Sequence, residues 1–381
     1  MTAAAVCFWV AIAGLAYVFV GYPATVWLAS RLRPMRPGQT LDVSDTQVAV
    51  LIAAHNETDT LAAKLRQLMA EPRVAAVHVG IDGGSPEVVA AIEPLRSDHP
   101  DRIAVHAFAA RRGKPAVLSD MMPQVAQPIT VMADARQRLG EGAIEALVRR
   151  LADASVGVVS GELVFEAEDA TSSAAGVGAY WRYEKLIRRS EANFRGVPGA
   201  TGALYAIRTE LMRPIAENTL LDDVVIPMQA VETGAKCVFE PAALVYDRPT
   251  TEPGREAVRK RRTIAGAAQL AIAQPRWLLP WRNPIWWEFG SHKLARLLAP
   301  LLLVAALAAN VALATGSQFY LLLLGLHLAF YAVAGLGYLA QRLGAKLPGA
   351  SVPLMFVTLN GTTALALVDA ARGRFTAAWR R

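Results

Sequence analysis

VAVLIAAHNETD, residues 48–59, begins as an unbroken apolar run and turns polar at His55. The apolar part is rich in β-branched residues and predicts a buried strand. The polar part contains helix-capping residues, so we expect a helix to begin near Thr60. A buried strand that leads at once into a helix favours an α/β domain.

Further strand-like runs follow this stretch, and helical patterns alternate with them. We expect strands at residues 74–81, 103–108 and 129–133, and helices at residues 60–69 and 142–151. The alternation predicts a mostly parallel sheet that helices cover on both faces.

Polar side chains stand where three of the expected strands end, at His55, Asp82 and Asp134. Ligands of such sheets bind beyond the carboxyl ends of the strands, so these residues predict a site at that edge. Each acid also has a simpler interpretation. Asp82 can make a turn, and Asp134 can cap the next helix.

Two glycine-containing segments can bring the backbone close to a ligand. The loop Arg111-Arg112-Gly113-Lys114 can offer backbone N–H groups and a lysine to a phosphate, or it is a solvated basic turn. Residues 196–203, GVPGATGA, are small enough for a bulky ligand to approach, or they form a tight loop between elements.

Two adjacent acids, Asp222 and Asp223, precede an amphipathic stretch at residues 224–231. They can be helix-start acids that the helix dipole favours. As a functional pair, one acid accepts a proton while the other orients it.

A basic run follows the acids, and its Arg255, Arg259 and Arg262 share one helical face. A membrane-surface helix explains most of this run at least as well as a ligand site does. Trp277, Trp281, Trp286 and Trp287 then predict a membrane interface, with ligand stacking as the alternative.

Hydrophobic residues make up 54% of the 381-residue chain, which is high for a soluble protein. Residues 6–29 are long and apolar enough to cross a bilayer, as are residues 294–315 and 319–340, with a weaker candidate at residues 352–368. The flank RLRPMR at residues 31–36 places the domain that follows on the cytoplasmic side.

Four regions are therefore expected along the chain. They are an N-terminal transmembrane helix at residues 1–30, a cytoplasmic domain at 47–254, basic and Trp-rich membrane-interface helices at 255–293, and C-terminal transmembrane segments at 294–370. Three C-terminal crossings would place the basic C-terminal tail outside, against the charge rule. Either one segment is interfacial or re-entrant, or the tail breaks the rule.

The net charge of +7 fits anionic lipid headgroups and a phosphorylated ligand better than nucleic acid, because many basic residues stand at membrane edges. The two cysteines, Cys7 and Cys237, argue against a disulfide framework and suit a reducing compartment.

The segments that carry a family resemblance extend from the first apolar span to about Pro300. They read VAVLIAAHNE (48–57), DGGS (82–85), RRGKPAVLSD (111–120), VMADAR (131–136), YWRYEKLIRRSE (180–191), VPGATGALYAIR (197–208), LDDVVIP (221–227), EPAALVYDRP (240–249), RKRRT (259–263) and WWEFGSHKLARLLAP (286–300). In this order the chain resembles the membrane-bound inverting glycosyltransferases of family 2, in the branch related to cellulose and hyaluronan synthases. The resemblance implies a GT-A domain, a Rossmann-like sheet that binds a nucleotide-diphospho-sugar, with UDP as the family's usual nucleotide.

The resemblance also implies roles for single residues. Asp223 matches the general base and Asp222 the preceding acid of a TED-like motif, and Arg262 matches the arginine that clamps the diphosphate in a QxxRW-type motif. Donor binding is expected of Ala54, His55, Glu57, Asp82, Lys114, Asp134, Arg136, Arg259 and Arg262, and acceptor binding of Gly199, Ala200, Thr201 and Gly202.

The sequence departs from the family pattern at three motifs. Asp134 matches the first acid of the DxD motif, but Arg136 replaces the second, which weakens the expectation of bound Mg²⁺ or Mn²⁺. Asp134 can still supply one metal ligand, or Arg136 can neutralise phosphate itself. Asp222 replaces a glutamate, and Thr263 replaces the tryptophan of QxxRW, which counts against processive polymerisation.

The expected activity is hexosyl transfer (EC 2.4) to a lipid-linked or saccharide acceptor for envelope or exopolysaccharide assembly. The expected location is the bacterial inner membrane, with membrane lipids and envelope-assembly proteins as partners and no nucleic acid. Alternatives are a processive polysaccharide synthase and a catalytically degenerate donor-binding scaffold. A transporter is disfavoured because the spans carry few charges.

Overall fold

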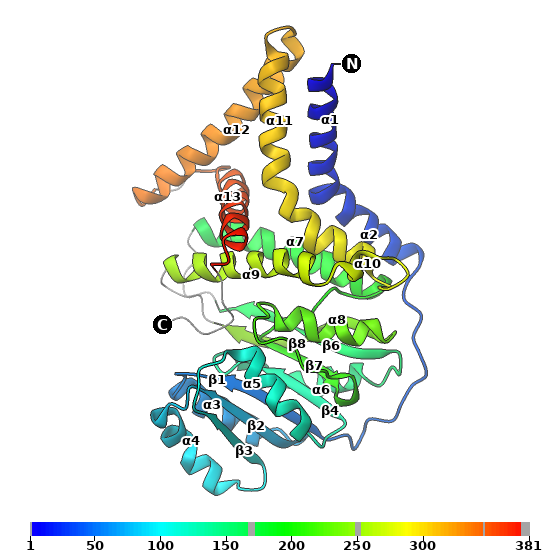
Figure 1. Cartoon of the computed structure of the whole chain (residues 1–381), viewed down its shortest axis with the longest axis vertical. Coiled ribbons are helices and arrows are strands. Elements are labelled where there is room, and N and C mark those ends of the chain that lie inside the picture. The colour runs from blue at the N-terminus through cyan, green and yellow to red at the C-terminus, as the bar shows by residue number, and fades with distance from the viewer. Residues whose placement is uncertain (1, 167–171, 248–252, 346, 375–381) are drawn as a thin grey trace.

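In the computed structural model, residues 2–166, 172–247, 253–345 and 347–374 are described, with the backbone alone at 172–180 and 253–257. A sheet domain occupies one end of the molecule, and long apolar helices extend from the other (Figure 1).

Eight strands of the described chain form one sheet, in the order β3-β2-β1-β4-β7-β6-β8-β5. Their bounds are β1 Val48–Ala54, β2 Val74–Asp82, β3 Ile103–Phe108, β4 Ile129–Ala133, β5 Arg138–Leu139, β6 Val156–Phe165, β7 Leu204–Arg208 and β8 Lys236–Asp247. Strands β1 to β4 are parallel, as the sequence predicts. Beyond β4 the sheet is mixed, because β7 runs antiparallel to both β4 and β6, while β6 and β8 are parallel.

Helices cover both faces of the sheet. Every residue of β1 is buried, whereas alternate residues would be exposed if one face were open. The covering helices are α3 Asp59–Met69, α4 Pro86–Asp98, α5 Lys114–Met121, α6 Ala143–Arg150 and α8 Asp222–Glu232. Gly80 of β2 lets α5 pack closely, since a Cβ there would lie 2.2 Å from Val117.

Two longer helices, α7 (Ser172–Phe194) and α9 (Pro253–Ala273), lie between the sheet domain and the apolar helices (Figure 1). The basic residues 259–262 belong to α9, as the helical pattern predicts. The expected interface role of Trp277 is wrong, because this side chain is 0% exposed and packs edge-on against Phe289 in the domain core. Trp281 remains 75% exposed.

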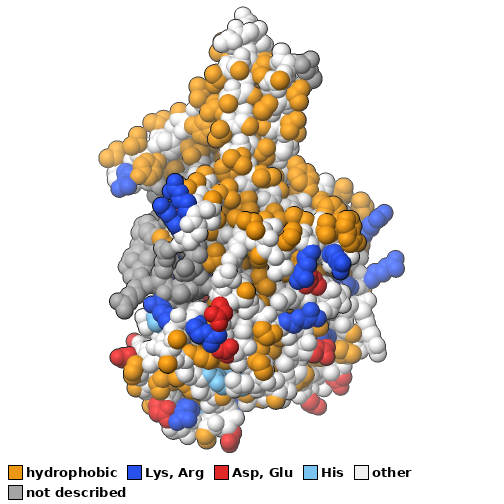
Figure 2. All heavy atoms as spheres, in the orientation of Figure 1, with side chains coloured by type: hydrophobic (Ala, Val, Ile, Leu, Met, Phe, Trp, Pro, Cys, Tyr) orange, Lys and Arg blue, Asp and Glu red, His pale blue; other side chains and the backbone are white. Residues whose placement is uncertain are grey.

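Four helices of the described chain are long and apolar enough to cross a membrane, namely Ala3–Leu32, Trp286–Ala314, Gln318–Arg342 and Ser351–Ala371. The first comprises α1 (Ala3–Ala16), a π-helical turn (Tyr17–Gly21) and α2 (Tyr22–Leu32). The second begins with α10 (Trp286–Glu288) and ends with α11 (Ala299–Ala314), which packs against α1. Hydrophobic side chains cover this end of the molecule, whereas acidic side chains gather on the sheet domain (Figure 2).

The last two apolar helices are α12 (Gln318–Arg342) and α13 (Ser351–Ala371). Helix α13 packs against α9 and α7, and its Asp369 pairs with Arg261 of α9. The C-terminal end of α13 therefore lies beside the sheet domain. Arg372 thus follows Asp369 on the domain side of the apolar helices, whereas Arg380 and Arg381 lie outside the described residues, and the number of crossings stays a prediction.

Candidate functional site

Four charged residues from separate parts of the sequence meet at the carboxyl ends of the central strands. Asp134 follows β4, Lys114 begins α5, and Asp222 and Asp223 begin α8. The Lys114 Nζ lies 2.8 Å from Asp134 Oδ1 and 3.1 Å from Asp222 Oδ2. The structure thus brings together four of the residues that the sequence singled out.

Lys114 is held in its charged form. Burial alone would disfavour the ammonium, but the charges of Asp134, Asp222 and Asp223 outweigh burial and raise the pKa of Lys114 well above its usual value. Its side chain is only 16% exposed. Lys114 therefore presents a permanent positive charge between two carboxylates.

The pKa of Asp223 is raised as well, which for a carboxyl group favours the neutral form. Burial and the charge of Asp222 raise its pKa to about 6, against the opposing charges of Lys114 and Lys293. A carboxylate with this pKa is ionised at neutral pH and is a stronger base than an ordinary aspartate. Both acids also stand in the first turn of α8, where the helix dipole favours negative charge.

The glycine-containing loop predicted to face the acceptor wraps around Asp223. Gly202 N donates to Asp223 Oδ2 at 3.2 Å, and Ala200 N donates to the Asp223 carbonyl at 2.7 Å. A Cβ on Gly202 would lie 3.0 Å from the same carboxylate oxygen, and Gly199 has a φ of +114°. Only glycine fits both demands without displacement.

Arg188 of α7 holds this loop from the other side. Its guanidinium donates to Thr201 Oγ1 and to Ser160 Oγ, each at 2.8 Å, and Ser160 Oγ accepts from Thr201 N at 2.9 Å. Sequence reasoning did not single out Arg188 or Ser160, because the two contacts join elements far apart in the chain.

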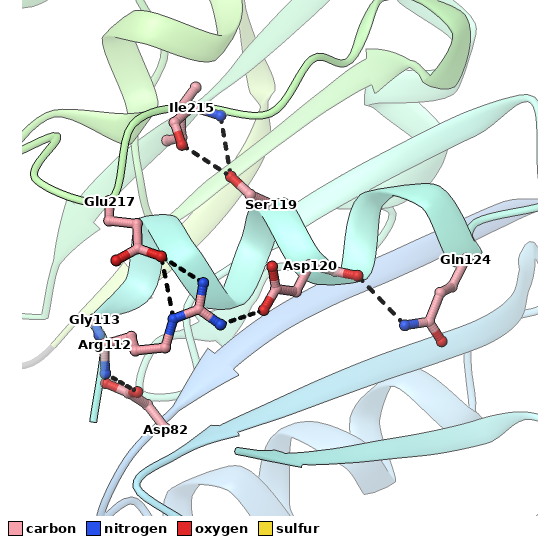
Figure 3. A network of polar contacts seen from close by, with 8 residues as sticks. All are labelled: Asp82, Arg112, Gly113, Ser119, Asp120, Gln124, Ile215 and Glu217. Atoms are coloured by element: carbon pink, nitrogen blue, oxygen red, sulfur yellow. Dashed lines mark hydrogen bonds and ion pairs between the residues drawn. The ribbon is translucent and has the colours of Figure 1, made fainter. Parts of the chain in front are cut away.

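Asp82 is the last residue of β2 and is 0% exposed. Its two carboxylate oxygens accept from the backbone N–H groups of Arg112 and Gly113, at 2.7 and 2.8 Å (Figure 3). These two N–H groups are therefore not available to a phosphate, and phosphate binding by the rest of the loop stays a prediction. Asp82 uses the two N–H groups to position Lys114, and a direct contact of Asp82 with a donor stays a prediction.

The Arg112 side chain joins the same loop to the segment that leads into α8. Its guanidinium bonds Asp120 of α5 and Glu217, and Ser119 accepts from Ile215 N at 3.0 Å (Figure 3). The chain before Asp222 is thereby fastened to the helix that begins with Lys114.

The residues of the turn after β1 form hydrogen bonds with one another and with the backbone at Asp82. The Glu57 carboxylate accepts from His55 N at 2.7 Å, and His55 Nδ1 lies 2.6 Å from the Asp82 carbonyl oxygen. Ala54 is fully buried. These bonds place the turn beside the Asp82 loop, where donor contacts by Ala54, His55 and Glu57 remain predictions.

Arg136, which was considered as a cation for the donor phosphates, points toward the end of β8. Its guanidinium lies 2.6 Å from the buried Asp247 Oδ2. Of the basic residues on α9, Arg261 pairs with Asp369. Arg262 is half-buried, and its Nε has no hydrogen-bond partner among the described residues. Arg259 is exposed, and Arg255 belongs to the residues whose side chains are not described.

Helix α9 is fastened to the segment before Asp222. Gln269 accepts from Leu220 N at 3.0 Å and donates to the Asn218 carbonyl at 2.8 Å. Gly266 lies against Leu221, where a Cβ would come within 2.5 Å. Arg262 stands about one turn before Gly266 on the same face of α9, and its contact with a donor stays a prediction.

The residues that would hold a divalent cation of the DxD type are already engaged or replaced. Mg²⁺ in nucleotide sites is usually held by one or two carboxylates together with the substrate phosphates, and the described residues contain no group of three or more His, Cys, Asp or Glu that could hold a metal without them. Asp134 already binds the Lys114 ammonium, and Arg136 stands where a second acid would be.

Lys64 is a charged residue of this region that sequence reasoning missed. It is 3% exposed on α3, and its Nζ has no hydrogen-bond partner in the described part of the chain. Burial lowers its pKa to about 8, although the charge of Asp134 opposes the shift. The sequence feature that could have revealed Lys64 is a lysine on the apolar face of α3, between the buried Leu61 and Leu68.

The comparisons with known proteins agree with this fold. A family model described as "Glycosyltransferase like family 2" matches residues 46–266. No curated protein matches the chain at a significant level.

Among solved structures, the chain is similar to a mannosyltransferase from Pyrobaculum calidifontis in complex with GDP-Man and Mn²⁺, at 21% identity and a TM-score of 0.70. The match covers 96% of this chain and 99% of the other, so it includes the apolar helices. S. aureus TarS 1–349 in complex with UDP-GlcNAc also matches, at 10% identity and a TM-score of 0.45, over 70% of this chain and 81% of the other. The expected GT-A fold, flanked by apolar helices, is confirmed.

Proposed function

Because the chain belongs to the glycosyltransferase-like family 2, whose members transfer sugars from nucleotide-sugar donors, we propose that it is an inverting enzyme with Asp223 as its base. The acceptor hydroxyl attacks the anomeric carbon of a nucleotide-diphospho-sugar in one displacement. The observation that carries the proposal is the Asp223 carboxylate, held by Gly202 N beside the charged Lys114–Asp134–Asp222 group.

Asp223 removes the acceptor proton as the new glycosidic bond forms. Its raised pKa makes it a better proton acceptor, and it is still ionised at neutral pH. The loop Gly199-Ala200-Thr201-Gly202 borders this carboxylate, and we assign it to the acceptor. Asp222 orients Lys114 and keeps the pKa of Asp223 high.

The leaving nucleoside diphosphate gains negative charge, which fixed cations stabilise. Lys114 and Arg262 supply those cations in this proposal. Donor contacts by Ala54, His55, Glu57, Asp82 and Arg259 belong to the proposal on the strength of the motif positions.

The apolar helices support a membrane-bound enzyme whose acceptor is lipid-linked or a saccharide of the bacterial envelope. In this proposal, residues 1–30 and 294–370 anchor the chain, residues 47–254 form the catalytic domain, and residues 255–293 lie at the membrane surface. Relationship to the cellulose and hyaluronan synthase branch and a UDP donor are parts of the same proposal. Thr263 in place of tryptophan favours single addition over processive synthesis.

A donor screen on the detergent-purified full chain tests this function. The panel contains UDP-sugars and also GDP-sugars, since the similar mannosyltransferase binds GDP-Man. Released nucleoside diphosphate is measured with a membrane-lipid extract as acceptor. Release from one donor supports the transferase, whereas nucleotide binding without release from any donor favours the degenerate scaffold.

Asp223→Asn tests the base. The change keeps the shape of the side chain, so donor affinity should stay within about twofold, while turnover should fall by about 10² to 10⁴. Asp98→Asn, at an exposed position on α4, is the matched control and should leave both quantities unchanged. Normal turnover by Asp223→Asn would show that another residue is the base.

A further inference from the structure

Two lysines stand around the one DxD carboxylate that this chain retains. Lys114 donates to Asp134 at 2.8 Å, and the buried Lys64 lies close enough for the Asp134 charge to affect it. Arg136, at the position of the second acid, pairs with Asp247 instead. The surroundings of Asp134 are therefore rich in positive charge before any ligand arrives.

The Lys114 ammonium lies between Asp134 and Asp222, at 2.8 and 3.1 Å. A divalent cation bound by these two carboxylates would need the place that the ammonium holds. Such an ion would also meet the charge of Lys64, and like charges in a half-buried site repel strongly. The protein's own cation thus competes with any metal for the same oxygens.

Lys114 also has the chemistry to bind phosphate. An ammonium has three N–H donors, and one of them is donated to Asp134. The 3.1 Å contact with Asp222 is an ion pair without a hydrogen bond among the described residues, so N–H donors remain for a phosphate oxygen. Asp134 is 33% exposed on the side chain, so the group is open to a ligand. Lys64 has no hydrogen-bond partner among the described residues, and it is near enough to Asp134 for the two charges to interact.

We propose that Lys114, supported by the buried charge of Lys64, neutralises the donor diphosphate in place of a divalent cation, so that donor binding and transfer need no metal. This inference rests on the proposed function, because it presumes a nucleotide-diphospho-sugar donor. It departs from the use of the DxD motif that the family resemblance implies.

Calorimetric titration of UDP and GDP into the full detergent-purified chain tests the proposal directly. The affinity for the nucleotide that binds should change by less than about twofold between EDTA and Mn²⁺. An affinity at least about tenfold weaker in EDTA would overturn this inference and leave the proposed function standing. Absence of binding by both nucleotides in both conditions would instead count against the proposed function.

Lys114→Ala tests whether the Lys114 ammonium takes the place of a metal ion or only supports the fold. Removal of the ammonium leaves Asp134 and Asp222 facing each other without a counter-charge. Nucleotide affinity in EDTA should fall by at least about tenfold, and Mn²⁺ should restore much of it. Free Mn²⁺, followed by its paramagnetic resonance signal without nucleotide, should bind this variant more tightly than it binds the wild type. Equal Mn²⁺ binding by both proteins would contradict the proposal.

Two further variants complete the test. Lys64→Met keeps the length of the side chain and removes its charge without unpairing a carboxylate, so affinity in EDTA should fall several-fold. Unchanged affinity would remove Lys64 from the proposal. Lys236→Ala is the matched lysine control, because Lys236 begins β8 and donates to the Arg36 carbonyl away from the site. It should bind nucleotide as the wild type does.

Discussion

Asp223 illustrates how single residues acquire their chemistry in this protein. The same residue type has different environments at Asp82, Asp134 and Asp223. Asp82 is saturated by backbone N–H groups, and Asp134 is paired with Lys114. Asp223 is half-buried, and desolvation together with the like charge of Asp222 raises its pKa to about 6. Environment thus gives three aspartates three different settings, and only that of Asp223 suits the base that we propose.

The pH dependence of turnover follows from this shift. A base must be ionised, so activity should be lost as pH falls through about 6, and not near the ordinary aspartate pKa of 3.8. One unit below the midpoint, turnover should be about tenfold under its plateau. The rate at saturating donor, measured from pH 4.5 to 8, checks this.

Asp222→Asn provides the comparison for the pH profile. It removes the negative neighbour, so the acidic limb should move to lower pH, as expected for a coupled pair of acids. A limb that lies near pH 4 in the wild type, or that does not move in the variant, would contradict the assignment.

At the scale of elements, the site depends on loops fastened to helices. Arg112 joins α5 to the segment before α8 through ion pairs whose partners are 36% to 62% exposed. Such exposed pairs contribute little to stability, at most about 1 kcal/mol each. They link the helix that begins with Lys114 to the segment that leads to Asp222.

Gly202→Ala tests the fit between the 199–202 loop and α8. A Cβ there would press on Asp223 Oδ2 at 3.0 Å, so the loop or the carboxylate must shift. We expect turnover to fall by about tenfold or more, since small misplacements of a catalytic group are costly.

Gly335→Ala is the glycine control, because nothing lies within 4 Å of a Cβ at that position of α12. Turnover of this variant should equal that of the wild type. Thermal unfolding of both variants shows whether a loss of turnover reflects unfolding. Undiminished activity in Gly202→Ala would mean that the loop is not packed against a working base.

At the scale of the whole molecule, α9 decides where the C-terminal end of α13 lies. Asp369 of α13 pairs with Arg261 of α9, which joins this end of α13 to the helix beside the sheet domain. If α12 and α13 together make one return across a bilayer, Arg372 and the domain share one side and Thr2 lies on the other. Three separate C-terminal crossings would instead place Arg372 on the side opposite the domain.

Cysteine labelling checks this topology. In a Cys7→Ser background, Arg372→Cys and Asp98→Cys should react alike with a membrane-impermeant maleimide in oriented vesicles, and Thr2→Cys should react oppositely. Cys237 is buried and contributes little background. Labelling of Arg372→Cys in the manner of Thr2→Cys would contradict the return path.

Much of this protein could be predicted from local sequence. The apolar runs at residues 48–54, 74–81, 103–108 and 129–133 form the parallel strands, and the acids that follow them lie at the expected edge. Periodicity and strand-end polarity suffice here because each parallel strand is buried by helices that are close to it in the chain. The apolar spans were equally visible, since length and composition alone make a helix capable of crossing a bilayer.

Tertiary structure alone decided which charges meet and which are already satisfied. No local pattern distinguishes Lys114, placed between two carboxylates, from Arg136, paired with Asp247. The burial of Lys64 and Trp277 and the pairing of Asp369 with Arg261 likewise depend on packing between distant segments. Charge interactions fall with distance in space and desolvation depends on burial, and neither quantity is a property of neighbouring residues along the chain.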